Sequence, residues 1–437
     1  MSSEAWTGVA VAGVTAAYAL GSRRLSSTPL SSAIVFVGCG ILLGPALLDL
    51  VDLEHDAAPI ILLLEITLAL VLFTDAMTVR RRDLQTGGFV PGRLLSLGLP
   101  LSIGAGWLLA WPLLPGLTMW ELALVGAILA PTDAALGKTA ISNPRVPALV
   151  RQGLNVESGL NDGMTLPFFL LFLAAIPGTH YAEEGVAGVF WRALVLSTAL
   201  GLLIGGFGGR LLQWARVRGW ATREWRQVYL LAVAGASYEL AVLTDGSGFI
   251  AAWVAGFACG FAMRRFRTGS EVEGPDRTAD FAENLGGLLA SLSLLVFGAV
   301  LLGPALEHLS WRLVLYAVLS LTVVRMVPVA LSLAGSRLRL PTVAYIGWFG
   351  PRGLASVVLA LLVVEEHVPG VELLGRVVAI TVGLSVLLHG ASAVFLAERY
   401  GRWHEKTAAT TSDLREGTPV LETPGRRRLG PLDQPET

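Results

Sequence analysis

The sequence predicts an all-α polytopic membrane protein, and three observations support this prediction. The 437-residue chain is 54% hydrophobic and only 15% charged, whereas a soluble domain usually contains about 25% charged residues. A mean hydropathy of +0.64 reflects repeated apolar runs that are long enough to cross a bilayer. Arginines are concentrated in every second loop between these runs, as in proteins that cross a membrane many times.

The apolar runs predict about thirteen transmembrane helices, because lipid forces backbone groups to form hydrogen bonds within each helix. The first run lacks the basic start and the cleavage site of a signal peptide, so we count it as a span. We expect a transmembrane domain over residues 1–400 and a disordered cytoplasmic tail over residues 401–437. The expected spans are 6–20, 32–50, 58–78, 91–114, 119–142, 153–176, 186–211, 227–243, 246–263, 284–304, 309–334, 341–364 and 372–397.

The charges in the loops predict the orientation of the chain. Every second loop is basic, whereas the intervening loops carry Asp and Glu. Basic residues favour the cytoplasmic side, so we expect the N-terminus outside and the C-terminus in the cytoplasm of a plasma (inner) membrane. The basic loops contain Arg23 and Arg24, Arg80 to Arg82, Arg145 and Arg151, the arginines between 216 and 226, Arg264, Arg265 and Arg267, and Arg337 and Arg339.

Two of the predicted spans contain a break near their middle. The fifth contains "APTD", which ends in Thr132 and Asp133, and the twelfth contains "GPRG", which carries Arg352. Proline removes a backbone donor and disfavours a helical conformation in the residue before it, so both helices should unwind there. A pair of broken helices in corresponding positions predicts a transporter with a binding site near the bilayer midplane.

The spacing of the two breaks predicts an inverted repeat. The breaks lie seven spans apart, and this odd offset gives the two broken helices opposite directions in the bilayer. We therefore expect two six-helix units, one over about 6–176 and the other over about 227–397, joined by a connector helix over about 186–211. The sequences of the two units show no convincing similarity, so this expectation depends on topology alone.

Other spans contain ionisable residues, which are costly inside a membrane and therefore mark functional candidates. The sixth span contains "NVESGLNDGM", in which Glu157 is four residues from Asn161, and Ser158 is four residues from Asp162. These four side chains share one broad face of a helix. The eleventh span carries Arg325 deep in the apolar run "LTVVRMVPVAL".

These motifs resemble the monovalent cation:proton antiporter-1 family, which contains the NhaP and NHE-type sodium/proton exchangers. The resemblance depends on the order of "APTDAAL", "ESGLNDG", a buried arginine and "GPRGLAS", and it covers roughly residues 30 to 400. It implies the NhaA/NhaP-like antiporter fold, in which the two broken helices cross each other.

The resemblance also implies a role for each polar residue. Asp162 would bind the ion and the proton, with Ser158 and Asn161 beside it, while Thr132 and Asp133 would lie at the crossing. Na+ would be held at Asp162, Ser158 and Thr132. The remaining roles are a structural ion pair for Glu157 and Arg325, charge compensation at the broken helices for Arg352, and an additional ion pathway for Asp75. Glu65 is a further candidate for this pathway because it lies deeper in the third span.

Simpler interpretations stay open for three of these residues. Asp162 also fits a helix-start residue at the cytoplasmic interface, and Asp133 also fits a cap for a broken helix. Asp75 also fits a solvated carboxylate, because three arginines follow the third span closely.

The implied function is exchange of a monovalent cation for H+ by alternating access, with electroneutral one-for-one stoichiometry and a role in pH and sodium homeostasis. Na+ is the expected cation, and Li+ and K+ stay open because oxygen ligands suit all three. We expect no enzyme activity, no cofactor besides the transported Na+ and H+, no nucleic acid and no ATP. The chain lacks the Gly-x-x-x-x-Gly-Lys motif of ATPases. The expected partners are the lipid bilayer and a second copy in a homodimer.

Two other classes of function, an intramembrane hydrolase and a carrier of organic anions, fit the sequence less well. An intramembrane aspartyl hydrolase would also place two aspartates in the membrane, but its Gly-x-Gly-Asp motif is missing, since "GLN" precedes Asp162. A zinc protease would need His-Glu-x-x-His, which the sequence does not contain. The same fold carrying an organic anion is disfavoured by the acidic character of the predicted site.

Overall fold

The computed structural model describes residues 2–25, 28, 30–45, 47–50, 53–79, 88–133, 136–137, 140–141, 143–265, 280–366, 368–411 and 414–418. These residues form helices and no strands, which confirms the all-α prediction. The helices are α1 (Ser2–Leu25), α2 (Ser32–Leu43), α3 (Leu53–Thr78), α5 (Phe89–Arg93), α6 (Leu99–Leu113), α7 (Met119–Ile128), α9 (Ala148–Ala174), α10 (His180–Val189), α11 (Ser197–Val217), α12 (Arg223–Val242), α13 (Gly248–Arg265), α15 (Asp280–Phe297), α16 (Gly303–Glu307), α17 (Trp311–Leu321), α18 (Val323–Ser332), α19 (Leu340–Trp348), α20 (Leu354–Glu365) and α21 (Val371–Thr410).

Each of the thirteen predicted spans coincides with a helix or a run of consecutive helices in the described part of the chain. Three π-helical segments, Leu94–Gly98, Phe190–Leu196 and Gly298–Leu302, connect α5 to α6, α10 to α11 and α15 to α16. Six of the resulting segments are long and apolar enough to cross a membrane by themselves: Pro59–Thr78, Phe89–Leu113, Gly185–Val217, Phe281–Glu307, Trp311–Ser332 and Val371–Thr410.

The second span is shorter than predicted. It was expected to reach residue 50, but α2 ends at Leu43 with Gly44 as its C-cap. Pro45 follows directly, and the residue before a proline is disfavoured in a helical conformation. The Gly-Pro pair therefore ends this helix early.

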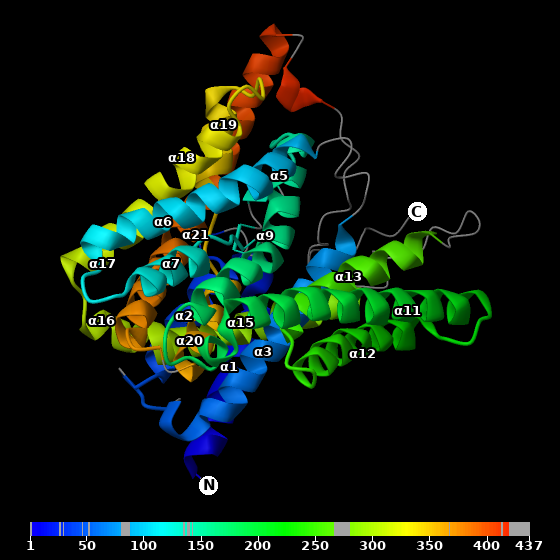
Figure 1. The fold of residues 1–437 in the computed structure, drawn as a ribbon. Helices are drawn as coiled ribbons and strands as arrows, with labels where there is room; N and C mark the ends of the chain where they lie inside the picture. Colours follow the sequence, from blue (N-terminus) through cyan, green and yellow to red (C-terminus); the bar gives the residue numbers. More distant parts are fainter. Residues whose placement is uncertain are drawn as a thin grey trace.

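The helices form two groups (Figure 1). In the first group, α13 packs against α3, α11 and α12, while α15 packs against α2 and α3. In the second group, α6 packs against α7, α17 and α18, while α21 packs against α17 and α20. Helix α9 contacts both groups, since it packs against α7 on one side and against α3 and α13 on the other.

Glycines allow the closest approach inside the first group. Gly201, Gly205 and Gly209 are spaced four residues apart on α11 and face α13. A Cβ at Gly201 would lie 2.6 Å from the carbonyl oxygen of Ala251, and one at Gly209 would lie 2.7 Å from that of Cys259. Small residues with this spacing are typical of tightly packed membrane helices.

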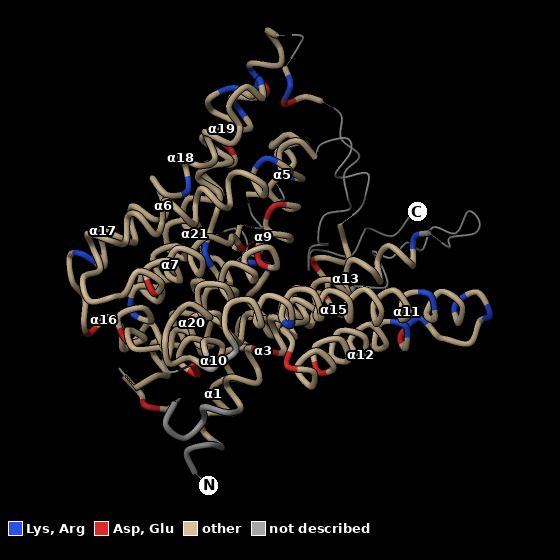
Figure 2. Tube along the Cα trace, viewed as in Figure 1, with Lys and Arg blue, Asp and Glu red and all other residues tan. Residues whose placement is uncertain are grey.

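The charged residues follow the predicted alternation in most places. Figure 2 shows Lys and Arg near the ends of α19, α21 and α11, and Asp and Glu near the α12–α13 turn and α16. Two arginines near the acidic loops are paired with acids, because Arg192 lies 3.6 Å from Asp245 and Arg376 bonds to Glu372. The predicted loop arginines 80–82 and 267 lie outside the described residues.

The C-terminal boundary differs from the prediction of a disordered tail from residue 401. Helix α21 continues to Thr410, and a short 3-10 turn covers Arg415–Gly417. The Tyr400 ring stacks on Tyr345 with centroids 4.4 Å apart, and the Glu416 carboxylate accepts a hydrogen bond of 2.7 Å from the Arg339 amide. Residues 401–411 and 414–418 are therefore structured, whereas residues 419–437 lie outside the described part.

Candidate ion-binding site

The two predicted breaks meet in space. Helix α7 ends at Ile128 and leaves residues through Asp133 non-helical, while the second break separates α19 from α20. The Asp133 amide donates a hydrogen bond of 2.8 Å to the carbonyl oxygen of Pro351. The crossing therefore joins two unwound segments that are more than 200 residues apart in sequence.

Side chains of the second broken helix donate hydrogen bonds to the backbone carbonyl groups at the C-terminal end of α7, the first broken helix. Arg352 is fully buried, and its Nη1 donates to the carbonyl oxygens of Ala130 at 2.6 Å and Pro131 at 3.0 Å. Ser356 donates its hydroxyl hydrogen to the Ile128 carbonyl at 2.6 Å. The C-terminal end of a helix carries partial negative charge, so a guanidinium stabilises it there.

Asp133 takes the complementary position at the start of α20. Its Oδ2 accepts a hydrogen bond of 3.3 Å from the Leu354 amide. The N-terminal end of a helix carries partial positive charge, which favours a carboxylate. A Cβ at Gly353 would overlap this carboxylate, so only glycine permits the approach.

Helix α9 brings a hydroxyl and an amide to the same crossing. Thr132 and Ser158 place their hydroxyl oxygens 3.0 Å apart, and the Asn161 amide nitrogen donates to Thr132 Oγ1 at 2.7 Å. All three side chains are buried. The second atom of the Asn161 amide, Oδ1, is buried and has no hydrogen-bond partner among the described residues. The cluster therefore contains an oxygen acceptor that a cation or a water molecule can use.

Asp162 follows this cluster directly and lies midway along α9, partly buried. Helix α9 begins at Ala148, five residues before the predicted start of the sixth span. Asp162 is therefore roughly 20 Å from the beginning of its helix, at 1.5 Å per residue. This position does not fit a residue at the start of a helix.

Glu157 and Arg325 form a buried bidentate ion pair. Arg325 Nη1 lies 2.6 Å from Glu157 Oε1, and Nη2 lies 2.9 Å from Oε2. The side chains are only 3% and 4% exposed. The two parallel hydrogen bonds fix the relative orientation of the two side chains, and the opposite charges neutralise each other. Arg325 belongs to α18, which follows a discontinuity at Thr322, where φ is −109° and ψ is −80°.

The two remaining candidates lie on α3, which packs against α9. Asp75 is partly buried where α3 faces α9, and a Cβ at Gly159 would lie 3.6 Å from the Asp75 Cβ. Glu65 lies ten residues earlier, or roughly 15 Å along the helix axis, and its carboxylate lies near the Tyr238 side chain. The structure therefore brings Asp75 toward α9 and places Glu65 at a separate position.

Sequence reasoning missed three polar residues that contact the breaks. These are Ser356 on α20, and Ser385 and His389 on α21. All three are buried in apolar runs. Ser385 and His389 are four residues apart, and this spacing in an apolar span was the one signal that pointed to a shared helix face.

Comparisons with known proteins agree with this architecture. A family model described as the transmembrane region of sodium/hydrogen exchangers matches residues 10–399. A probable Na+/H+ antiporter of Schizosaccharomyces pombe is 26% identical over 337 residues, which cover 68% of this chain and 43% of that protein. The K+/H+ antiporter NhaP2 of Shewanella oneidensis is 27% identical over 409 residues, which cover 87% of this chain and 64% of that protein. The chain thus spans less than two thirds of the length of either relative.

A solved structure shows the same fold. The sodium proton antiporter MjNhaP1 from Methanocaldococcus jannaschii superposes with a TM-score of 0.73 at 20% sequence identity. The match covers 91% of this chain and 98% of that one. The crossing of two unwound segments therefore lies within an architecture that extends over nearly the whole described chain.

Proposed function

This chain belongs to the sodium/hydrogen exchanger family, and we propose that it is a secondary active antiporter that exchanges a monovalent cation for H+. Na+ is the proposed cation, and Li+ and K+ are its competitors. Relatives named as Na+/H+ and as K+/H+ antiporters both support cation/proton exchange. The choice among the cations is the part that needs measurement.

The oxygen cluster at the crossing carries the proposal. Thr132 joins Ser158 and Asn161 of α9, and Asp162 is the next residue on that helix. Hydroxyl, amide and carboxylate oxygens are hard ligands that can replace the water shell of a small cation. In this proposal the cation binds Asp162, Ser158 and Thr132, with the Asn161 Oδ1 in reach.

Exchange follows from competition for one carboxylate. A proton bound to Asp162 removes the charge that attracts the cation, and a bound cation disfavours the proton. Either occupant neutralises Asp162 before the site is moved. Cation and proton therefore travel in opposite directions without a further coupling device.

The buried charges support one-for-one stoichiometry. Two arginines, Arg325 and Arg352, lie with three carboxylates, Glu157, Asp133 and Asp162, at the crossing and on α9. Counting only these groups, and leaving aside Asp75 of α3 beside Gly159, the net charge with Asp162 ionised is one negative. One proton or one monovalent cation makes the site neutral, and a neutral site crosses a membrane at the lowest electrostatic cost. Asn161 cannot ionise, so it adds no second proton carrier.

The position of α9 supports alternating access. Its site-bearing face contacts the second helix group at α7, while Gly163 is so close to Trp253 of α13 that a Cβ would overlap the indole. The site thus lies beside the boundary between the two groups. Movement of one group relative to the other would expose it to each side of the membrane in turn.

The proposed setting is a plasma (inner) membrane with the N-terminus outside and the C-terminus in the cytoplasm. There the exchanger would serve pH and sodium homeostasis. The functional unit is proposed to be a homodimer, without a cofactor and without ATP.

The test is cation-driven proton movement in proteoliposomes that contain the full chain and an internal pH dye. We expect Na+ pulses to alkalinise or acidify the vesicles according to the gradient, with smaller responses to Li+ and K+. Asp162→Asn should give no response while it remains folded. A wild-type protein that responds to none of the three cations would overturn the proposal, and a larger response to K+ would overturn the choice of Na+.

A further inference from the structure

The second broken helix loses backbone hydrogen bonds at its centre, among them the one between Arg352 and Trp348. In a continuous α-helix the Arg352 amide would donate to the carbonyl oxygen of Trp348, four residues earlier. The break separates these two groups: the Trp348 carbonyl accepts instead from the Gly350 amide at 2.9 Å, and the other amide belongs to the fully buried Arg352. A buried backbone donor needs a new partner inside a membrane, and a carbonyl oxygen can accept a second hydrogen bond.

Two side chains of α21 contact both groups. The Arg352 amide donates to Ser385 Oγ at 2.7 Å, and His389 Nε2 lies 2.9 Å from the Trp348 carbonyl oxygen. A carbonyl oxygen can only accept, so this contact is a hydrogen bond in the tautomer that carries its hydrogen on Nε2. His389 Nδ1 lies 3.1 Å from the Ser385 hydroxyl and 2.9 Å from the Ser385 carbonyl. The pair thus replaces the missing helical hydrogen bond from outside.

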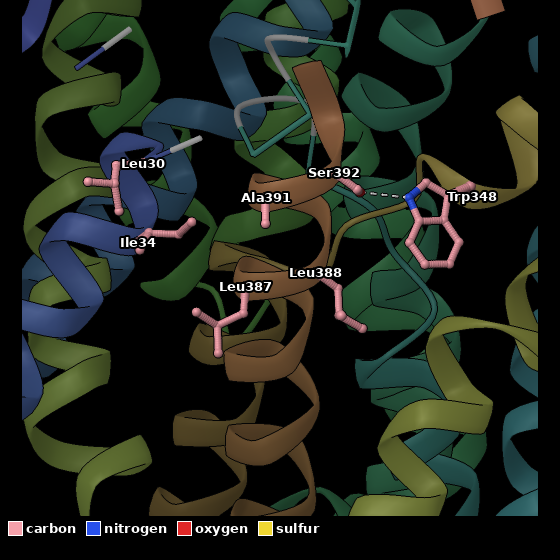
Figure 3. Close-up of a pocket in the computed structure, with 7 residues that line it drawn as sticks. All are labelled: Leu30, Ile34, Trp348, Leu387, Leu388, Ala391 and Ser392. Atoms are coloured by element: carbon pink, nitrogen blue, oxygen red, sulfur yellow. Dashed lines mark hydrogen bonds between the residues drawn. The ribbon is translucent and has the colours of Figure 1, made fainter. Parts of the chain in front are cut away.

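A third residue on the same face of α21 holds the end of α19. The Trp348 indole nitrogen donates to Ser392 Oγ at 3.0 Å, as Figure 3 shows. Ser392 and Trp348 line a pocket with Leu30, Ile34 of α2 and further residues of α21, and Figure 3 shows Trp348 on the other side of α21 from Ile34. This contact fixes a side chain, whereas the Ser385 and His389 contacts fix the backbone of the break.

The backbone of the break leads directly to the ion cluster. The segment held by Ser385 and His389 contains Pro351, whose carbonyl accepts the Asp133 amide, and Arg352, whose Nη1 binds the Pro131 carbonyl. Thr132 lies between Pro131 and Asp133 in the sequence, and its side chain binds Ser158 and Asn161. A shift of the break would therefore move an oxygen ligand of the proposed site.

We propose that Ser385 and His389 are positioning residues for ion binding, which hold the two ends of the second break so that Thr132 keeps its place beside Asp162. The inference rests on the proposed antiport function for its effect on transport. Its structural part is that α21 holds the break in place, and this part depends only on the hydrogen bonds of Ser385 and His389.

The test compares matched variants at His389 in the full-length protein. His389→Gln places an amide nitrogen at the same number of bonds from the backbone as Nε2, so it keeps the donor to Trp348. His389→Asn is shorter and loses that donor. We expect His389→Asn and Ser385→Ala to raise the apparent KM for Na+ roughly tenfold, the equivalent of one buried hydrogen bond. His389→Gln should stay near the wild-type KM, and so should the control Ser392→Ala.

A second measurement is independent of transport. Hydrogen–deuterium exchange of the segment 349–354 in detergent should be faster in Ser385→Ala and His389→Asn than in Ser392→Ala, at matched thermal stability. Unchanged hydrogen–deuterium exchange in this segment would overturn the inference. This measurement needs no transport, so it remains decisive if wild-type vesicles move no ions and the proposed function fails. An equal rise in KM for His389→Gln and His389→Asn would also overturn it, because the hydrogen-bond donor would then be irrelevant.

Discussion

At the scale of single residues, the buried charges are held by different means. Arg352 is bound by backbone carbonyls, Asp133 by a helix start, and Glu157 by another charged side chain. Asp162 differs because it follows a cluster that still contains an unused oxygen acceptor. The contacts of Arg352, Asp133 and Glu157 suit these residues to supporting the crossing.

The ion pair allows a direct test of this distinction. Removal of one member of a buried pair leaves an unpaired charge, which costs about 3–5 kcal/mol. We expect Glu157→Ala and Arg325→Ala each to lower the thermal unfolding temperature strongly, with partial recovery in the double variant. Strictly additive losses would contradict a pairwise interaction.

At the scale of elements, the two breaks support each other through short-range contacts that only glycine permits. Gly353 lies so close to the Asp133 carboxylate that no side chain fits between them. Gly375, in contrast, lies within α21 with no atom within 4 Å of a Cβ built on it. These two glycines form a matched pair for testing whether the crossing leaves no room for a side chain at Gly353.

Gly353→Ala should therefore lower both the unfolding temperature and the exchange rate, because it separates Asp133 from the start of α20. Gly375→Ala should be neutral or slightly stabilising, since alanine is favoured over glycine in a helix by about 1 kcal/mol. The readouts are thermal unfolding and Na+-driven proton flux in the same preparations. Equal behaviour of the two variants would argue against the crossing.

The sequence was sufficient to predict both breaks, because proline beside glycine or alanine has a direct effect on the backbone. It was not sufficient to predict what holds them. Ser385 and His389 are isolated polar residues in an apolar run, and their partners become visible only when α21 is packed against α19. The early end of α2 was missed because its Gly-Pro pair was included in an apolar run. The ordered segment around Glu416 was missed because a polar tail gives no local sign of docking.

At the scale of the whole molecule, the account predicts that membrane potential does no work on the transport cycle. An unbalanced charge would be driven by about 2.3 kcal/mol per 100 mV, whereas a site that is neutral when loaded is not driven. With fixed Na+ and pH gradients, a potassium–valinomycin potential of either sign should leave the rate and the end-point unchanged. A response that changes with the sign of the potential would indicate a second proton carrier, with Asp133 or Glu157 as the residue to test next.

The central claim is that proton and cation compete for Asp162, and proton release from purified protein tests it most directly. Weakly buffered detergent solutions of wild type and Asp162→Asn are monitored with a pH dye while NaCl is added, with choline chloride as the ionic-strength control. The account predicts that Na+ releases protons from the wild type in a saturable manner and releases none from Asp162→Asn. Equal release from both proteins, or no release from a wild type that exchanges ions in vesicles, would contradict the claim.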